Sequence, residues 1–108
     1  MWNAMAPLYF SRWEERYRPL VEVELMNPEP LRQFNATPFD LRADLGRIDA
    51  ETLVITGRYD FICGPAAAQV LADGIPRSEL VIVEDAGHML HLEQPTAYSA
   101  AVESFLAR

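Results

Sequence analysis

Two side chains that could share proton-transfer chemistry each follow a short apolar run. Asp60 comes shortly after the run at 52–56, and His88 comes shortly after the run at 79–83. A carboxylate bonded to one ring nitrogen of a histidine fixes its tautomer, and it stabilises the imidazolium that forms when the other nitrogen takes a proton. Either residue alone is more often structural. The pair, 28 residues apart and following two similar runs, predicts the acid and the base of a catalytic site.

The elements that would position this pair follow from the apolar pattern. The runs TLVIT at 52–56 and ELVIV at 79–83 are continuous and rich in β-branched residues, which is typical of strands covered on both faces of a parallel sheet. An alanine-rich stretch at 65–72 predicts a helix capped by Gly74, and residues 96–107 predict a final amphipathic helix. The order strand, helix, strand, helix predicts an α/β fold in which both loops meet at the carboxyl ends of the strands.

The first part of the chain differs in character, because it is rich in aromatic residues and proline. Tyr9, Trp13 and Tyr17 recur at a spacing of four, which predicts one buried face of a helix that starts near Pro7 and ends at Pro19. A second short helix is predicted at 21–26 and a connection at 39–46.

Composition excludes several classes of function. The net charge of −7 and the pI near 4.7 argue against nucleic acid or an anionic membrane surface as partner. No apolar run approaches the roughly 18–20 residues of a membrane helix. The single cysteine, Cys63, forms no internal disulfide, and with no signal peptide apparent we expect a cytoplasmic protein. We expect no cofactor. His88 and His91 lie three residues apart, but two histidines without a third ligand make a poor metal site.

Two segments resemble a known family. LVITGRYD at 53–60 and GHMLHLEQP at 87–95 resemble the closing segments of α/β-hydrolases, most of all the branch of proline iminopeptidases and related esterases. The resemblance implies that residues 46–108 form the C-terminal βαβα part of a parallel α/β-hydrolase sheet, and that residues 1–45 form a helical cap-like segment. It also implies that Asp60 is the triad acid and His88 the triad base.

The family's nucleophile is missing from this chain. In α/β-hydrolases it sits in a G-x-S-x-G elbow that precedes the acid, and none of the four serines lies in such an elbow. The resemblance therefore implies an N-terminal portion that carries the elbow, as a separate chain or a cleaved product, without which this chain is inactive. The substrates would be small esters, amides or short peptides. An aspartate in the elbow would instead imply a dehalogenase-like enzyme.

Other interpretations remain open. The chain could be a noncatalytic, truncated hydrolase fragment that acts as an interaction module, or one that self-associates through its open sheet edge. For individual residues the structural interpretation is favoured: we expect Cys63 to be a buried, inert thiol and His91 to pack near the entrance or face solvent. Glu14 and Glu15 are expected on a solvated helix face, although cap carboxylates hold the substrate amino group in iminopeptidase-type relatives.

Overall fold

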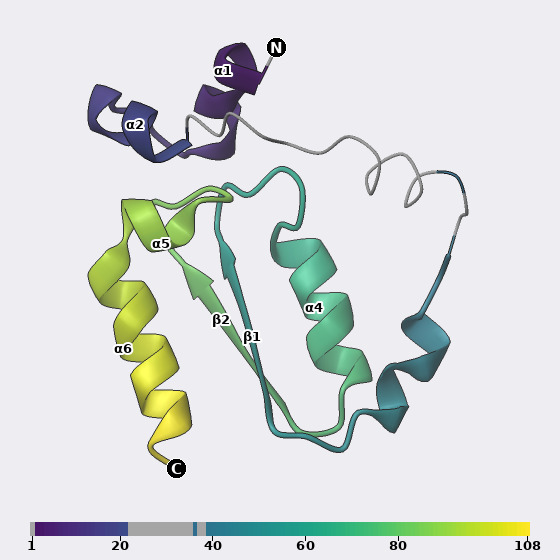
Figure 1. Ribbon diagram of the computed structural model, residues 1–108. Coiled ribbons are helices and arrows are strands. Elements are labelled where there is room, and N and C mark those ends of the chain that lie inside the picture. Colours follow the sequence, from purple (N-terminus) through teal and green to yellow (C-terminus); the bar gives the residue numbers. More distant parts are fainter. Residues whose placement is uncertain (1, 22–35, 37–38) are drawn as a thin grey trace.

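The computed structural model describes residues 2–21, 36 and 39–108 (Figure 1). Two strands lie side by side at its centre, one helix lies on each side of them, and the N-terminal segment lies beyond the strand ends. In chain order the elements are α1 (Trp2–Met5), η1 (Ala6–Tyr9), η2 (Glu15–Tyr17), α2 (Arg18–Val21), η3 (Arg42–Arg47), β1 (Thr52–Gly57), α4 (Pro65–Gly74), β2 (Ser78–Val83), α5 (Leu90–Glu93) and α6 (Pro95–Leu106).

The two strands are parallel, as the apolar runs predict. Their register pairs Thr52 with Ser78 and Gly57 with Val83, so both strands end at the same edge of the sheet. The described residues form no further strand, and the outer edge of each strand therefore lacks a strand neighbour there. Because the strands end together, the two loops that carry Asp60 and His88 leave the sheet side by side.

Helix α4 connects the strands and contacts both of them. It begins at Pro65, whose missing N–H costs nothing in a first helical turn, and it buries Ala68. The predicted cap at Gly74 is wrong, because Gly74 is the last helical residue and has no positive φ. Its role is steric: a Cβ there would stand 2.6 Å from Cδ1 of Leu45, so the glycine lets η3 pack against the helix end.

Helix α6 confirms the predicted final helix within two residues. Pro95 occupies its first turn, and Tyr98, Val102 and Phe105 are half-buried along one face. Leu106 is exposed. The single turn α5 precedes this helix and supplies Glu93, a residue that becomes important at the histidine loop.

The predicted continuous helix through Tyr9, Trp13 and Tyr17 is wrong. The chain is helical in η1 up to Tyr9, non-helical at 10–14, and helical again in η2 and α2. The backbone amides of Ser11 and Arg12 bond the distant Glu93 carboxylate instead of a carbonyl one turn earlier. This long-range bond replaces the local helix.

The aromatic residues nevertheless pack together, as expected for a buried stripe. The Phe10 and Tyr17 rings stack with centroids 4.6 Å apart, and Trp13 lies edge-on to both. Phe10, Tyr17, Ala6 and Val21 form a buried cluster. The small core of this N-terminal segment lies above the strand ends, and Met89 and Leu92 from the region of the histidine loop pack against it.

Three remaining predictions concern the first half of the chain. Pro19 lies inside α2 rather than ending a helix, because the first turn of a helix tolerates its missing N–H. The predicted helix at 21–26 falls almost entirely outside the described residues. Residues 39–46, predicted as a connection, include most of η3.

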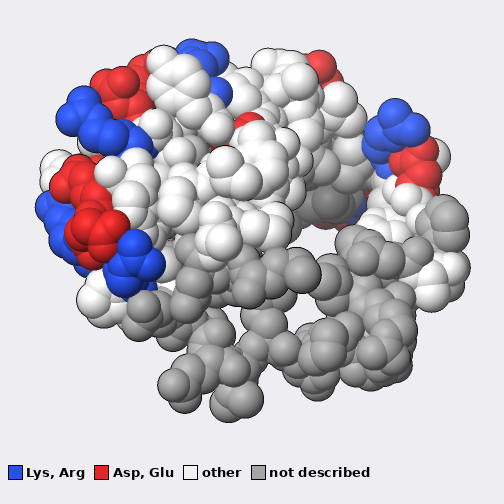
Figure 2. All heavy atoms as spheres, turned by 90° about the horizontal axis from the view of Figure 1, so that it is seen from above, with Lys and Arg blue, Asp and Glu red and all other residues white. Residues whose placement is uncertain are grey.

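Charge on the described surface is mixed rather than of one sign. Red and blue side chains lie next to each other in Figure 2, in keeping with exposed ion pairs such as Glu14–Arg16 and Glu15–Arg18. Across the described parts of the chain, no helix combines the length and apolar character that crossing a bilayer requires.

Candidate functional site

Asp60 lies in the tight turn that follows β1. Its backbone N–H donates to the carbonyl of Gly57, and its Oδ1 accepts from the N–H groups of Ile62 (2.8 Å) and Cys63 (3.0 Å). The side chain is only 4% exposed. These two backbone bonds fix the carboxylate and leave its other oxygen, Oδ2, for a further donor.

That donor is His88. Its Nδ1 lies 2.9 Å from Oδ2 of Asp60, so the two residues singled out in the sequence meet directly. The His88 side chain is 34% exposed, and its Nε2 has no hydrogen-bond partner among the described residues. A bond from Nδ1 to a carboxylate leaves Nε2 as the nitrogen that can take a proton. The imidazole is thus held at Nδ1 and is partly accessible, a geometry that can serve a base.

The Asp60 carboxyl group titrates below its ordinary range. Burial acts to raise its pKa, but the hydrogen bonds from Cys63 N–H, His88 and Ile62 N–H together outweigh burial and lower the pKa. The carboxylate is therefore ionised at neutral pH, which is the state that orients an imidazole and stabilises an imidazolium.

The two loops are joined backbone to backbone. The Tyr59 N–H donates to the carbonyl of Ala86 (2.9 Å), and Ala86 is fully buried. A Cβ on Gly57 would stand 2.2 Å from the Gly87 oxygen, so only glycine permits this approach. Asp85 has a φ of 52°, a left-handed conformation that aspartate tolerates and that turns the chain from β2 into the histidine loop.

The aromatic ring of Tyr9 lies beside the histidine. The Tyr9 ring lies edge-on to His88 at 5.5 Å and edge-on to Phe61 at 5.4 Å. Phe61 is 59% exposed, and Tyr59 in the same loop is 60% exposed. Tyr9 of the N-terminal segment thus contacts both His88 and Phe61 of the loop after β1.

Glu93 makes contacts near the histidine that the sequence did not reveal. Its Oε1 accepts from Ser11 N–H (2.8 Å), Ser11 hydroxyl (2.6 Å) and Arg12 N–H (3.2 Å), and its Oε2 accepts from Gly87 N–H (2.6 Å). The only sequence signal was its place in the Glu-x-Pro segment before α6, which suggests a helix start and not a bond to the histidine loop.

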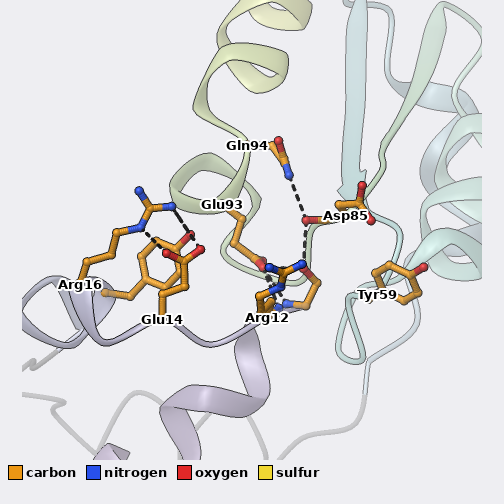
Figure 3. Close-up of a pocket in the computed structure, with 9 residues that line it drawn as sticks. Arg12, Glu14, Arg16, Tyr59, Asp85, Glu93 and Gln94 are labelled. Carbon is orange, nitrogen blue, oxygen red and sulfur yellow. Dashed lines mark hydrogen bonds and ion pairs between the residues drawn. The ribbon is translucent and has the colours of Figure 1, made fainter.

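A cavity of about 490 Å³ adjoins the histidine loop but does not include Asp60 or His88 (Figure 3). Its walls are strongly polar and carry both charges. The lining residues are Ser11, Arg12, Glu14, Arg16, Tyr17, Tyr59, Asp85, Glu93 and Gln94. Because the geometry of the Asp60–His88 pair suits an oriented base and this cavity does not reach the pair, we place the candidate site at the pair.

The prediction that Cys63 is buried is wrong, because its side chain is exposed. Its backbone is occupied, with the N–H bonded to Asp60 and the carbonyl accepting from the Thr56 hydroxyl at 2.8 Å. The loop therefore holds the Cys63 backbone inward and leaves the thiol outside. His91 faces solvent, as expected, with its ring 6.2 Å from that of Tyr98.

Glu14 and Glu15 are exposed, as predicted, although they do not share one helical face. Glu14 pairs with Arg16 at 2.9 Å, and Glu15 pairs with Arg18 at 2.7 Å. Glu15 also accepts from Trp13 Nε1 at 3.0 Å. In this arrangement both carboxylates are engaged by neighbouring arginines. Within the described ranges, no three His, Cys, Asp or Glu side chains are grouped as metal ligands.

Comparisons with known proteins agree with this architecture. A sequence model of the family described as TAP-like protein, an α/β-hydrolase family, matches residues 33–108. A proline iminopeptidase from Pestalotiopsis fici is 39% identical over 70 residues, covering 65% of this chain and 25% of that protein. A putative carbamate hydrolase from Pseudomonas syringae is 33% identical over 78 residues, covering 71% of this chain and 30% of the relative.

A solved esterase from Exiguobacterium antarcticum superposes on 97% of this chain and 41% of its own, with a TM-score of 0.83. At 22% identity this likeness shows the fold. The chain spans about a quarter to a third of the length of the curated relatives it matches. The fold class predicted from the two strand-ending motifs is confirmed, and the chain belongs to the TAP-like family of α/β-hydrolases.

Proposed function

We propose that this chain supplies the acid and the base of a serine-type α/β-hydrolase whose nucleophile lies on an N-terminal portion. The observation that carries the proposal is the Asp60–His88 bond, with Asp60 buried and Nε2 of His88 accessible. The relatives named above, a proline iminopeptidase and a putative carbamate hydrolase, support hydrolysis of an acyl bond. An N-terminal portion as partner agrees with the share of those relatives that the chain spans.

In the proposed reaction, a serine hydroxyl of the N-terminal portion attacks the carbonyl carbon of an ester, amide or short peptide. Nε2 of His88 takes the hydroxyl proton, and Asp60 stabilises the imidazolium. When the tetrahedral intermediate collapses, Nε2 returns the proton to the leaving oxygen or nitrogen. Water then enters and attacks the acyl carbon while His88 takes one of its protons, and Nε2 returns that proton to the serine oxygen as the acyl group leaves as a carboxylic acid. Residues 1–45 would act as part of a cap over this site.

A second candidate is a noncatalytic fragment that binds another sheet. The open edge of β1 and the exposed side chains of Tyr59, Phe61 and Ile62 favour it. A catalytic chain that pairs with an N-terminal portion would present the same open edge and the same exposed side chains. The two candidates therefore differ in chemistry rather than in the surface they use.

A fluorophosphonate probe, which reacts with activated serines, separates them. The protein is purified from its native source, treated with the probe and analysed by denaturing intact-mass measurement. We expect the phosphonyl adduct on an associated polypeptide that contains an elbow serine, and none on the chain of 12.2 kDa. If this chain is alone or its companion takes no probe, the serine-hydrolase proposal is wrong. A companion with an elbow aspartate would indicate the dehalogenase-like reaction instead.

A further inference from the structure

The carboxylate of Glu93 accepts hydrogen bonds from two segments that are far apart in the sequence. Oε2 accepts the backbone N–H of Gly87, the residue immediately before His88, at 2.6 Å. Oε1 accepts the N–H and hydroxyl of Ser11 and the N–H of Arg12, 81 to 82 residues away along the chain. Figure 3 shows Glu93 reaching from α5 toward Arg12 on the N-terminal segment.

Two further contacts join the histidine loop to residues 9–12. The Met89 N–H donates to the carbonyl of Tyr9 at 3.1 Å. A Cβ added to Gly87 would stand 2.7 Å from the Tyr9 oxygen and 2.8 Å from the Ser11 nitrogen. Residues 9–12 therefore lie directly on the backbone that flanks His88.

These contacts hold the backbone from which the His88 side chain starts. Asp60 holds the ring through Nδ1, but the ring starts from a backbone whose neighbours on both sides, Gly87 and Met89, are bonded to Glu93 and Tyr9. A carboxylate that accepts backbone N–H groups forms short, charge-assisted bonds, which resist displacement more than neutral ones. If Glu93 released Gly87, the loop would lose one of these two supports.

We propose that Glu93 is a positioning residue for His88, acting through Gly87 and coupling the histidine loop to residues 9–12 of the cap-like segment. Its consequence for turnover rests on the proposed hydrolase function, whereas its effect on the loop does not. A purely local role, as a start signal for α6, would need neither the bond to Gly87 nor those to Ser11 and Arg12.

The test replaces the carboxylate and follows the loop by NMR. Glu93→Gln keeps the shape but turns one acceptor oxygen into an amide donor. The remaining oxygen is expected to face the three donors of Ser11 and Arg12, so Gly87 loses its acceptor. The matched control is Glu103→Gln, the same substitution at an exposed position on α6. The signals to follow are hydrogen exchange at the Gly87 amide and the downfield Nδ1 proton of His88, measured on the protein in its native state of assembly.

We expect Glu93→Gln to speed exchange at Gly87 by about tenfold or more, as loss of a charge-assisted bond implies, and to broaden or shift the Nδ1 proton. Glu103→Gln should leave both signals unchanged. Unchanged signals in a folded Glu93→Gln variant would overturn the proposal. If that variant does not fold, Ser11→Ala takes its place: faster exchange at Gly87 supports the coupling, and unchanged exchange overturns it.

Turnover separates this proposal from the hydrolase proposal. In the complete hydrolase, Glu93→Gln should lower kcat with KM nearly unchanged, because a displaced base affects the chemical step more than binding. If the wild-type protein hydrolyses nothing, the hydrolase proposal fails, yet the two NMR signals still decide whether Glu93 positions His88. If Glu93→Gln moves the NMR signals but leaves kcat unchanged, the structural coupling is supported and the effect on turnover is contradicted.

Discussion

The backbone oxygen of Gly87 lies where the side chain of residue 57 would begin, 2.2 Å from an ideal Cβ on Gly57. Gly57 ends β1, and Gly87 leads into His88, so this contact fixes how closely the loops of Asp60 and His88 approach. We expect Gly57→Ala to destabilise the fold by about 1–3 kcal/mol or more, because backbone atoms must move to admit the methyl group.

Urea unfolding measures this effect, with Gly46→Ala as its control. Nothing lies within 4 Å of a Cβ at Gly46, and its φ is not positive, so alanine there should leave stability unchanged or slightly increased. Equal midpoints for the two variants would show that the close approach at Gly57 is not a constraint on the fold.

Acid pH should weaken the fold partly through Asp60. The folded-state pKa of Asp60 lies below that of the unfolded chain, near 4. The unfolded state therefore binds more protons in the interval between the two values, and stability rises with pH across it. The contribution of Asp60 is fully present above pH ~4 and is lost as pH falls through the folded pKa.

Unfolding free energies measured between pH 6 and pH 3 test this, with Asp60→Asn as the comparison. The variant should lose less stability than the wild type over this interval. Glu15 and Asp40, whose pKa values arginine bonds lower to about 2, are exposed and should respond to salt. Measuring in ~1 M salt suppresses their contribution and leaves that of the 4%-exposed Asp60. Identical pH slopes for variant and wild type would contradict the assignment.

The features that could be predicted from the sequence depend on the local residue pattern and on one topological rule, that adjacent parallel strands end at the same edge of the sheet. The runs at 52–56 and 79–83 are strands because β-branched residues dominate them, and parallel strands must end at one edge. The meeting of Asp60 and His88 follows from these two facts. The resemblance at 87–95 added the family, which the comparisons confirm.

The features that it missed depend on contacts across most of the chain. The spacing of Tyr9, Trp13 and Tyr17 predicted a helix, but the Glu93 carboxylate takes the amides that this helix would have used. No pattern near Ser11 reveals an acceptor 82 residues away. Cys63 was predicted to be buried because members of the resembled family commonly carry small or apolar residues at this place, whereas the two bonds to Asp60 turn this loop so that the thiol faces outward.

The exposed thiol leads to a direct chemical prediction. A maleimide should modify Cys63 stoichiometrically in the folded chain without denaturant, because the side chain is accessible. Cys63→Ser provides the unreactive control and should leave stability within about 0.5 kcal/mol, as is usual for exposed positions. Modification that requires denaturant would restore the buried interpretation of this thiol.

Hydrolysis by the complete protein, compared between His88→Ala and His91→Ala, tests the central claim most directly. Both substitutions remove an imidazole within one short segment, but only His88 bonds Asp60, whereas His91 faces solvent. We predict that His88→Ala lowers kcat for ester and amide substrates by at least about 10³-fold, and that His91→Ala changes it little. Full turnover by a folded, assembled His88→Ala protein would contradict the assignment of His88 as the base.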